Sequence, residues 1–289
     1  MCVIDFSLKT SAEFTPQVDR LIQLALEEDI GRGDVTTQAL IPPEKKGAAQ
    51  VRAKERLVAA GLPVAARVFM KLDREVHFLP MVREGQEVEA GAVLAQLRGP
   101  VASILTGERV ALNFLMRLSG IATYTRQVVA AVQDFPVAVV DTRKTTPGWR
   151  VLEKYAVKVG GAKNHRFGLF DGVLIKNNHL TAVGSITEAV RRARQQTHQL
   201  LKIEVEVADL KGLAEALAAG ADIIMLDNMA DADLLEAVKL TQGRALLEAS
   251  GGMTLERLPQ VAATGVNCIS MGALTHSAPA VDIHLLLVS

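Results

Sequence analysis

The chain has 289 residues, 49% of them hydrophobic and 22% charged, and its 32 basic and 32 acidic side chains give a formal net charge of zero. This composition is typical of a globular enzyme and excludes a disordered chain, while the balanced charge and 4% aromatic content argue against a nucleic-acid-binding protein. No apolar run approaches about 18 residues, so no membrane span is expected, and the widely separated Cys2 and Cys268 predict free thiols in a reducing cytoplasm.

The N-terminal part mixes helical and strand patterns. A helix is predicted to start at Thr15-Pro16, an N-cap followed by proline, and to stop near Gly31-Arg-Gly33. A strand at Gln50–Ala53 and a helix at Pro63–Leu72 follow, and Val82–Leu97 then alternates between turn signals. This last segment is similar to half of a biotinyl-type carrier hairpin, but it contains no lysine to bear the prosthetic group. We therefore interpret it as scaffold.

A very apolar helix is predicted over Ser103–Ser119, interrupted by Arg109 and Arg117. Such a helix is expected to be buried between domains or subunits. Arg109 then needs a partner, because a buried, unpaired guanidinium is costly. A nearby acid such as Glu108 and an anionic ligand are equally compatible with the pattern.

From about Gly120 onward, short apolar strands alternate with helical patterns, which predicts a parallel sheet with right-handed crossovers. The expected strands are Val137–Val140, Gly172–Ile175, Ile203–Val207, Ile223–Leu226, Ala245–Ala249 and Cys268–Met271. The expected helices include Ile186–Ala193, Leu210–Ala218, Leu234–Leu240 and Leu255–Ala263. Six or seven such units favour a TIM-like barrel, whose active site lies at the C-terminal rim of the strands. A doubly wound open sheet is the alternative, weakened because no GxGxxG follows the first strand.

The residues at and after the expected strand ends fall into three groups, one basic, one acidic and one uncharged. Residues 142–176 carry eight Lys or Arg side chains and only two acids, with Arg143 and Lys176 directly after strands. Between Glu204 and Glu236 the balance reverses to nine acids and one lysine. The last two units end in Ser250-Gly-Gly252 and Gly272.

Each group suits a different part of a ligand. Arginine and lysine suit carboxylates or a diphosphate. Acids suit Mg²⁺ or a cationic sugar transition state, and Ser-Gly-Gly before a helix offers backbone N–H groups to a phosphate. Together they describe phosphoribosyl diphosphate and a ring diacid.

Long ordered blocks of the sequence closely resemble the quinolinate phosphoribosyltransferase family. In the basic segment these blocks are Asp141-Thr-Arg-Lys-Thr-Thr-Pro-Gly148, Lys154-Tyr-Ala-Val157, Gly160-Gly161, Asn164-His-Arg-Phe-Gly168 and Leu174-Ile-Lys-Asn-Asn-His179. Elsewhere they are Glu28-Asp-Ile-Gly-Arg-Gly-Asp-Val-Thr-Thr37, Gly107-Glu-Arg-Val-Ala-Leu-Asn113, Leu118-Ser-Gly-Ile-Ala122, Glu204-Val-Glu206, Met225-Leu-Asp-Asn228, Glu248-Ala-Ser-Gly-Gly252 and Met271-Gly-Ala-Leu-Thr-His276. One departure is Gly160-Gly-Ala162, where many relatives have three glycines.

The resemblance implies a fold and a reaction. It implies an N-terminal α/β sandwich domain (residues 1–118, with the tail 277–289 packed on it) and an open α/β barrel of six to seven parallel strands (119–276). It implies a cytoplasmic homodimer that converts quinolinate and phosphoribosyl diphosphate to nicotinate mononucleotide, diphosphate and CO₂ with Mg²⁺, in NAD biosynthesis. No nucleic acid or membrane partner is expected.

The resemblance also implies a role for each site residue. The quinolinate carboxylates would be held by Arg109 of the neighbouring subunit and by Arg143, His165, Arg166 and Lys176. Lys144 would face the diphosphate or ribose, and Glu206 and Asp227 would bind the ribose hydroxyls and Mg²⁺. The 5′-phosphate would be framed by Ser250, Gly251, Gly252, Gly272 and His276. Lys144, Lys176, Glu206 and Asp227 are the expected catalytic residues.

Three rival functions remain open. Lys176 at a strand end could be the nucleophile of a Schiff-base aldolase. A paralogue of the same fold could take another substrate. A carrier or scaffold protein built on the 82–97 hairpin is the alternative without catalysis.

Overall fold

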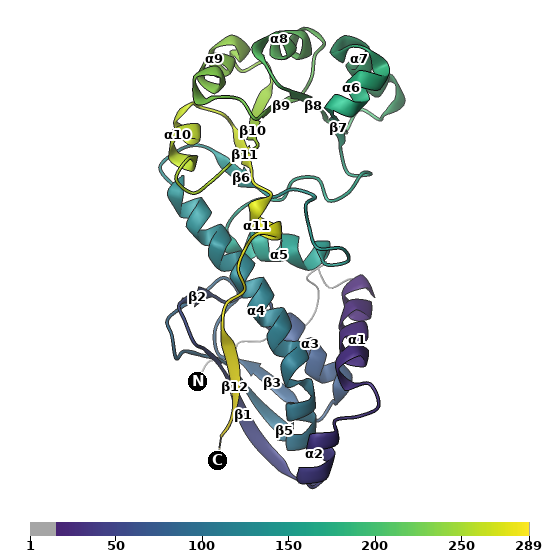
Figure 1. Ribbon diagram of the computed structural model, residues 1–289, viewed down its shortest axis with the longest axis vertical. Coiled ribbons are helices and arrows are strands. Elements are labelled where there is room, and N and C mark those ends of the chain that lie inside the picture. Colours follow the sequence, from purple (N-terminus) through teal and green to yellow (C-terminus); the bar gives the residue numbers. More distant parts are fainter. Residues whose placement is uncertain (1–15, 289) are drawn as a thin grey trace. The chain divides into compact units, whose positions relative to one another are not determined.

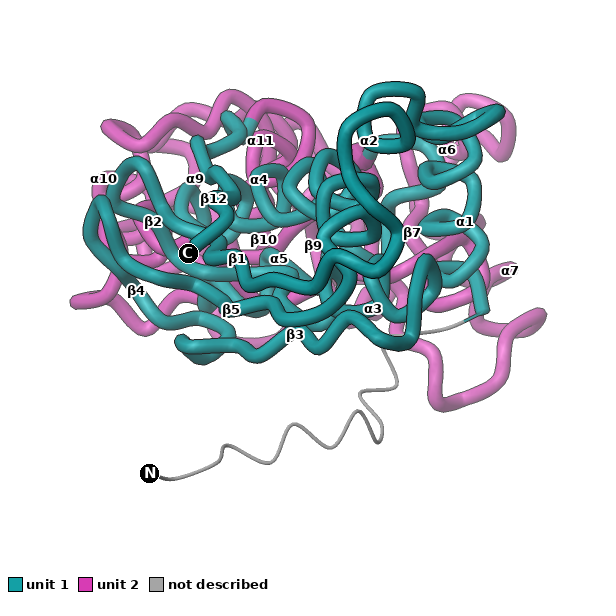
Figure 2. The backbone as a smooth tube through the Cα atoms, turned by 90° about the horizontal axis from the view of Figure 1, so that it is seen from below, with its two compact units in different colours: residues 1–125, 146–161, 278–289 teal, residues 126–145, 162–277 magenta. Residues whose placement is uncertain are grey.

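The computed structural model describes residues 16–288, and the chain divides into two compact units, shown in different colours in Figure 2. Unit 1 comprises the chain up to Thr125, Thr146–Gly161 and the segment from Ala278 onward. Unit 2 comprises Arg126–Thr145 and Ala162–Ser277. Thr15, the predicted N-cap, and Cys2 lie outside the described residues.

Unit 1 is built on an antiparallel sheet of four strands in the order β12-β1-β5-β3. Its strands are β1 (Lys46–Ala53), β3 (His77–Pro80), β5 (Val93–Pro100) and β12 (Ile283–Val288). Strands β2 (Leu57–Val58) and β4 (Glu87–Val88) form a separate antiparallel pair. In β1 the buried Ala49, Val51 and Ala53 alternate with less buried residues, so one face of the sheet lies on the core.

The helices of unit 1 follow their apolar spacing. They are α1 (Pro16–Ile30), α2 (Val35–Leu40), α3 (Leu62–Leu72), α5 (Arg150–Gly160) and the part of α4 (Val101–Ala131) that ends at Thr125. Helix α1 buries Val18, Ile22 and Leu26, one residue per turn, and begins at Pro16. This confirms the predicted helix from Pro16 and its predicted end near Gly31.

Helix α4 is much longer than the predicted Ser103–Ser119 segment, at 31 residues. It continues through Gly120, where a side chain would meet the carbonyl oxygen of Pro279 at 2.0 Å, so the C-terminal segment requires glycine there. Within the single chain the side chain of Arg109 is exposed on α4, so among the described residues it has no buried acid such as Glu108 as its partner. No helix among residues 16–288 is long and apolar enough to cross a membrane.

Unit 2 contains a parallel sheet of six strands in the order β6-β11-β10-β9-β8-β7. They are β6 (Ala138–Val140), β7 (Val173–Ile175), β8 (Ile203–Val207), β9 (Ile223–Asp227), β10 (Leu246–Ser250) and β11 (Cys268–Ser270). The first strand neighbours the last, and β6 and β7 form the two edges, as in a barrel left open on one side. The predicted α/β architecture with an open barrel is therefore confirmed, and the doubly wound sheet is wrong.

Helices cover the outer side of this curved sheet, as α7, α8, α9 and α10 do in Figure 1. The helices of unit 2 are α6 (Asn177–Val183), α7 (Ile186–Gln196), α8 (Leu210–Ala218), α9 (Asp231–Thr241), α10 (Leu258–Ala263) and α11 (Ala273–His276). A strand buried on both faces is usually apolar throughout. Strand β8 departs from this, because the buried Glu204 and Glu206 alternate with Ile203, Val205 and Val207. The two acids therefore share the inner face of the barrel.

Candidate active site

A cavity of about 340 Å³ lies in unit 2, where the parallel strands end. It is lined by Thr142, Arg143, Lys144, His165, Arg166, Leu174, Lys176, Glu206, Met225, Asp227, Glu248, Ser250 and Ser270. Eight of the predicted site residues line it, namely Arg143, Lys144, His165, Arg166, Lys176, Glu206, Asp227 and Ser250. Gly251, Gly252, Gly272 and His276 belong to the same unit without lining this cavity, and Arg109 belongs to unit 1.

Asp141 anchors the basic side of the cavity. Its side chain is fully buried and accepts hydrogen bonds from Asn164 Nδ2 (2.6 Å) and from the backbone N–H of His165 (2.8 Å). The carboxylate thereby ties the end of β6 to the loop that precedes β7. In the Asp141-Thr-Arg-Lys block, the aspartate positions the loop, and the cations that follow line the cavity.

Arg166 is a half-buried cation with spare hydrogen-bonding capacity. Its Nη1 donates to the carbonyl oxygen of Gly172 at 2.9 Å, and its buried Nε has no hydrogen-bond partner among the described residues. Burial and the nearby charge of Arg143 lower the pKa of Arg166, and Glu204 opposes that effect. An anion in the cavity would relieve the repulsion between the two guanidinium groups.

Lys176 joins the basic and acidic sides. Its Nζ lies 2.7 Å from Glu206 Oε2, and the side chains are 47% and 10% exposed, respectively. The second acid, Asp227, stands at the end of β9 and accepts a hydrogen bond from Asn228 Nδ2 at 3.1 Å. Lysine, glutamate and aspartate thus meet at one rim from three neighbouring strands.

The Ser250–Gly252 loop has a backbone that depends on glycine. Gly251 has φ +89°, and a Cβ atom there would lie 2.2 Å from Asn228 Oδ1. Gly272 is less crowded, since its Cβ would lie 2.9 Å from Lys144 Cδ and 3.1 Å from the ring of His276. Lys144, Gly272 and His276 therefore lie close together, so the residue predicted to face the diphosphate or ribose adjoins two of those predicted to frame the 5′-phosphate.

An acidic cluster that the sequence interpretation left without a role lies on the inner face of the barrel. Glu204 Oε2 and Glu248 Oε2 are 3.0 Å and 3.6 Å from His165 Nε2. The three ligand-type atoms lie within 4.8 Å of one another, close enough to consider a metal ion. Burial and the charge of Glu204 raise the pKa of Glu248 to about 7, and His165 opposes the shift.

The period of two along a strand could have revealed this cluster. Glu204 and Glu248 each precede a rim residue, Glu206 and Ser250, by two positions and must therefore share its face. The other nitrogen of the same ring, His165 Nδ1, accepts the backbone N–H of Arg166 at 2.7 Å. To bind a substrate carboxylate, as predicted, His165 would have to exchange one of these bonds.

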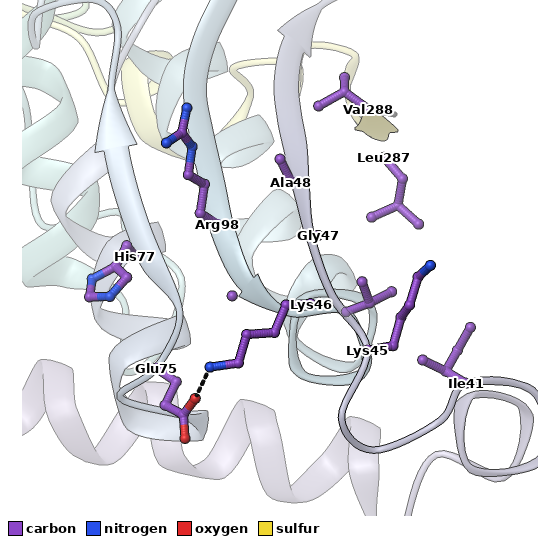
Figure 3. Close-up of a pocket in the computed structure, with 12 residues that line it drawn as sticks. Ile41, Lys45, Lys46, Gly47, Ala48, Glu75, His77, Arg98, Leu287 and Val288 are labelled. Atoms are coloured by element: carbon purple, nitrogen blue, oxygen red, sulfur yellow. Dashed lines mark hydrogen bonds and ion pairs between the residues drawn. The ribbon is translucent and has the colours of Figure 1, made fainter.

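A larger hollow of about 1020 Å³ lies in unit 1 and is lined by residues of β1, β3, β5 and β12 and of the segments next to them (Figure 3). Lys46 and Glu75 form an ion pair across it at 2.9 Å, with side chains 70% and 64% exposed. His77 and Arg98 stand opposite each other on neighbouring strands. These groups are solvated surface side chains, so the smaller cavity of unit 2 is the better candidate for chemistry.

Comparison with protein families accounts for nearly the whole chain. Residues 34–119 match the family described as "Quinolinate phosphoribosyl transferase, N-terminal domain", and residues 121–286 match the corresponding "C-terminal domain". A "Probable nicotinate-nucleotide pyrophosphorylase [carboxylating]" of Bacillus subtilis is 47% identical over 93% of both chains. A protein of the same description from Synechocystis is 51% identical over 94% of this chain and 92% of its own.

Solved structures are similar over the same extent. A nicotinate-nucleotide pyrophosphorylase from Francisella tularensis superimposes with a TM-score of 0.91 at 40% identity, covering 94% of this chain and 96% of that one. Its counterpart from Ehrlichia chaffeensis gives a TM-score of 0.89 at 36% identity, covering 93% and 98%.

Proposed function

Since the chain belongs to the quinolinate phosphoribosyltransferase family and is a phosphoribosyltransferase, we propose a specific reaction for it. It converts quinolinate and phosphoribosyl diphosphate to nicotinate mononucleotide, diphosphate and CO₂ in NAD biosynthesis. The observation that carries the proposal is the three-part cavity of unit 2. Cations suited to a dicarboxylate, two acids suited to a sugar cation and Ser250, the first residue of a glycine-bearing loop suited to a phosphate, all line it.

Binding of the two substrates follows from these charges. Arg143, Arg166 and Lys176 would hold the quinolinate carboxylates, since the buried Nε of Arg166 still needs an acceptor. Lys144, which packs beside Gly272, would face the phosphoribosyl donor. The Ser250–Gly252 loop and His276 would frame its 5′-phosphate.

The chemical steps would be electrostatically assisted. Departure of diphosphate leaves positive charge at the anomeric carbon, and Glu206 and Asp227 at the rim would stabilise it. The pyridine nitrogen attacks that carbon. The positively charged ring then withdraws the electron pair of the bond to the adjacent carboxylate, and CO₂ leaves.

Mg²⁺ fits the oxygen donors of the site. Glu206 and Asp227 offer carboxylate oxygens, the ligands that Mg²⁺ prefers together with water and substrate phosphates. Because Glu206 Oε2 is already bound by Lys176, we propose that its contact with the ion runs through water or substrate. The ion would neutralise the departing diphosphate. Chelation should abolish turnover, and restored Mg²⁺ should recover it; full activity in excess chelator would contradict the proposal.

We also propose that the enzyme is a cytoplasmic homodimer in which Arg109 serves the site of the partner. In support, Arg109 is exposed and forms no hydrogen bond or ion pair within residues 16–288. Mixing inactive Arg109→Ala and Lys176→Ala chains would then rebuild one complete site in each mixed dimer, recovering about a quarter of full activity. No recovery after verified subunit exchange would exclude a shared site.

Turnover with quinolinate and with nicotinate, each with phosphoribosyl diphosphate, decides the overall proposal. Diphosphate and CO₂ should form in equal amounts from quinolinate only. A preference for another acid would indicate a paralogue, and absence of diphosphate release with every pair would favour the scaffold reading.

The Schiff-base alternative is tested separately. A Schiff-base nucleophile must be a neutral amine, whereas Lys176 Nζ is ion-paired with Glu206. Borohydride treatment in the presence of carbonyl compounds should therefore leave Lys176 unmodified. A covalent adduct at Lys176 would support an aldolase instead.

A further inference from the structure

Two buried carboxyl groups converge on a single ring nitrogen inside the barrel. Glu204 on β8 and Glu248 on β10 are each only 4% exposed, and both direct Oε2 toward His165 Nε2. Their remaining oxygens, Oε1 of each, are buried without a hydrogen-bond partner among the described residues. Only Glu248 of the two also lines the cavity.

The ring of His165 can donate only one N–H hydrogen bond to the two carboxyl groups, so it cannot stabilise both of them in the ionised form. His165 Nδ1 accepts the N–H of Arg166, so the ring carries its proton on Nε2. That single proton is donated to Glu204 at the shorter distance of 3.0 Å. Two buried carboxylates this close repel each other, and one of them is stabilised by holding a proton of its own.

Glu248 is the group that holds this proton. Burial and the charge of Glu204 raise its pKa to about 7, while His165, the hydroxyl of Ser270 and Lys176 oppose the shift. The neighbour on β11 is Cys268, whose own pKa is raised by burial and by Glu248. A neutral carboxylic acid therefore faces the cavity near neutral pH.

The proposed reaction requires a proton at this place. When CO₂ leaves the pyridine ring, the electron pair of the broken C–C bond stays on the ring carbon. A C–H bond must then form there before product is released. The cations of the cavity wall, Arg143, Arg166 and Lys176, are poor proton donors compared with a carboxylic acid.

We propose that Glu248 donates the proton to the ring carbon that has lost CO₂, and that Glu204 and His165 position its carboxyl group. The O–H bond of Glu248 breaks as the C–H bond forms, and the resulting carboxylate takes a new proton from water before the next turnover. The inference rests on the proposed function, because it assumes the decarboxylation step.

The hydrogen isotope found in the product tests the donor. In equal parts of H₂O and D₂O, the ratio of H to D at the ring carbon depends on the group that delivers the proton. In Glu248→Gln, water must replace the carboxyl group, so turnover should fall ~10²–10⁴-fold and the isotope ratio should change. An unchanged ratio would overturn the proposal, whatever the rate.

The pH profile gives a second readout. In the native protein the proton-donating form of Glu248 is lost as pH rises through about 7, so kcat should decline above that pH. Glu248→Gln should lack this decline. Persistence of the same decline in the variant would assign it to another group and count against Glu248.

Glu153→Gln is the matched control, since Glu153 is a fully buried carboxyl in unit 1. Its substitution should leave the isotope ratio and the alkaline decline of kcat unchanged, even where the folded state is less stable. A metal ion at the cluster is the competing assignment. Tight binding of Zn²⁺ that disappears in Glu248→Gln would overturn proton donation, whereas lack of diphosphate release by the native protein would refute the proposed function itself.

Discussion

Glu153 in unit 1 and the pair Glu204 and Glu248 in unit 2 are buried acids in opposite situations. In unit 1, Glu153 accepts hydrogen bonds from Arg117 Nη2 (2.9 Å), Thr146 Oγ1 (2.9 Å) and Thr146 N (3.0 Å), so both of its oxygens are satisfied. The half-buried Glu84 of the same unit also has its oxygens satisfied, since it accepts the N–H groups of Gly61 and Leu62. In unit 2, by contrast, Glu204 and Glu248 each keep one buried oxygen without a partner within the described residues.

The difference separates charges that hold the fold from charges that await a ligand. A buried ionic group stabilises only when its hydrogen bonds are complete, and an incomplete one is retained at a cost to stability. The same distinction explains why the 340 Å³ cavity, rather than the 1020 Å³ hollow of unit 1, is the candidate active site. Incomplete buried hydrogen bonding identifies chemistry better than volume does.

The largest expected effect is a loss of folding stability in the variant Glu153→Ala. Removing this carboxylate takes away the ion-pair partner of Arg117 Nη2 and the acceptor of the N–H of Thr146. Breaking a buried pair on one side typically costs ~3–5 kcal/mol. Urea denaturation should show that loss, and an unfolding free energy within ~0.5 kcal/mol of the native value would contradict a structural role for Glu153.

The next effect is on activity with little effect on the fold. Arg143→Ala and Lys176→Ala each remove one fixed charge from the cavity, which typically lowers kcat ~10²–10³-fold. We expect kcat/KM to fall by at least that factor, with the urea midpoint nearly unchanged. Lys239→Ala, at an exposed ion pair on α9, is the control and should leave both quantities as they are. Near-native turnover in either cavity variant would refute these roles.

The sequence was sufficient to predict the barrel strands because each is a short apolar run followed by a polar residue. Strand β8 and helix α8 have the predicted bounds, and the other barrel strands differ from prediction by one residue at one or both ends. The predicted helix Ser103–Ser119 is shorter than α4 because glycine at position 120 indicates a boundary in the sequence pattern. This glycine serves a close approach of the Pro279 backbone, a tertiary contact that periodicity does not encode.

The rim residues could be predicted because strand ends in a parallel sheet meet at one edge. The interior pair Glu204 and Glu248 has no role in the sequence interpretation, because that interpretation considers only the residues that close each strand. His165 reaches them from a loop held by Asp141. The strand period places the two acids on one face, but their contact with the histidine is tertiary, and no local pattern shows it.

Glu248→Gln should have a smaller effect on stability, with a sign opposite to that of Glu153→Ala. The folded-state pKa of Glu248 is raised from 4.5 to about 7, so ionisation opposes folding. The penalty is absent below pH 4.5 and grows as pH rises toward 7, where it is on the order of 1–3 kcal/mol. Above pH 7 the variant should therefore be more stable than the native protein by urea denaturation. Equal or lower stability at pH 8 would mean that Glu248 is compensated, as Glu153 is.

The smallest expected effect belongs to a partly exposed ion pair in unit 1. Asp19 accepts hydrogen bonds from Arg67 Nε (2.7 Å) and Nη2 (2.6 Å), and this pairing lowers the pKa of Asp19 below 3.8. Because the folded-state pKa is depressed, the stabilisation is present above pH 3.8 and is lost as pH falls through the folded-state value. Solvent screening limits it to less than ~1 kcal/mol. The stability difference between the native protein and Asp19→Asn should therefore shrink only below pH 3.8, in the acidic range where Glu248 contributes no penalty. A difference that persists unchanged at pH 2.5 would mean that packing of the Arg67 side chain, rather than its charge, is what Asp19 supports.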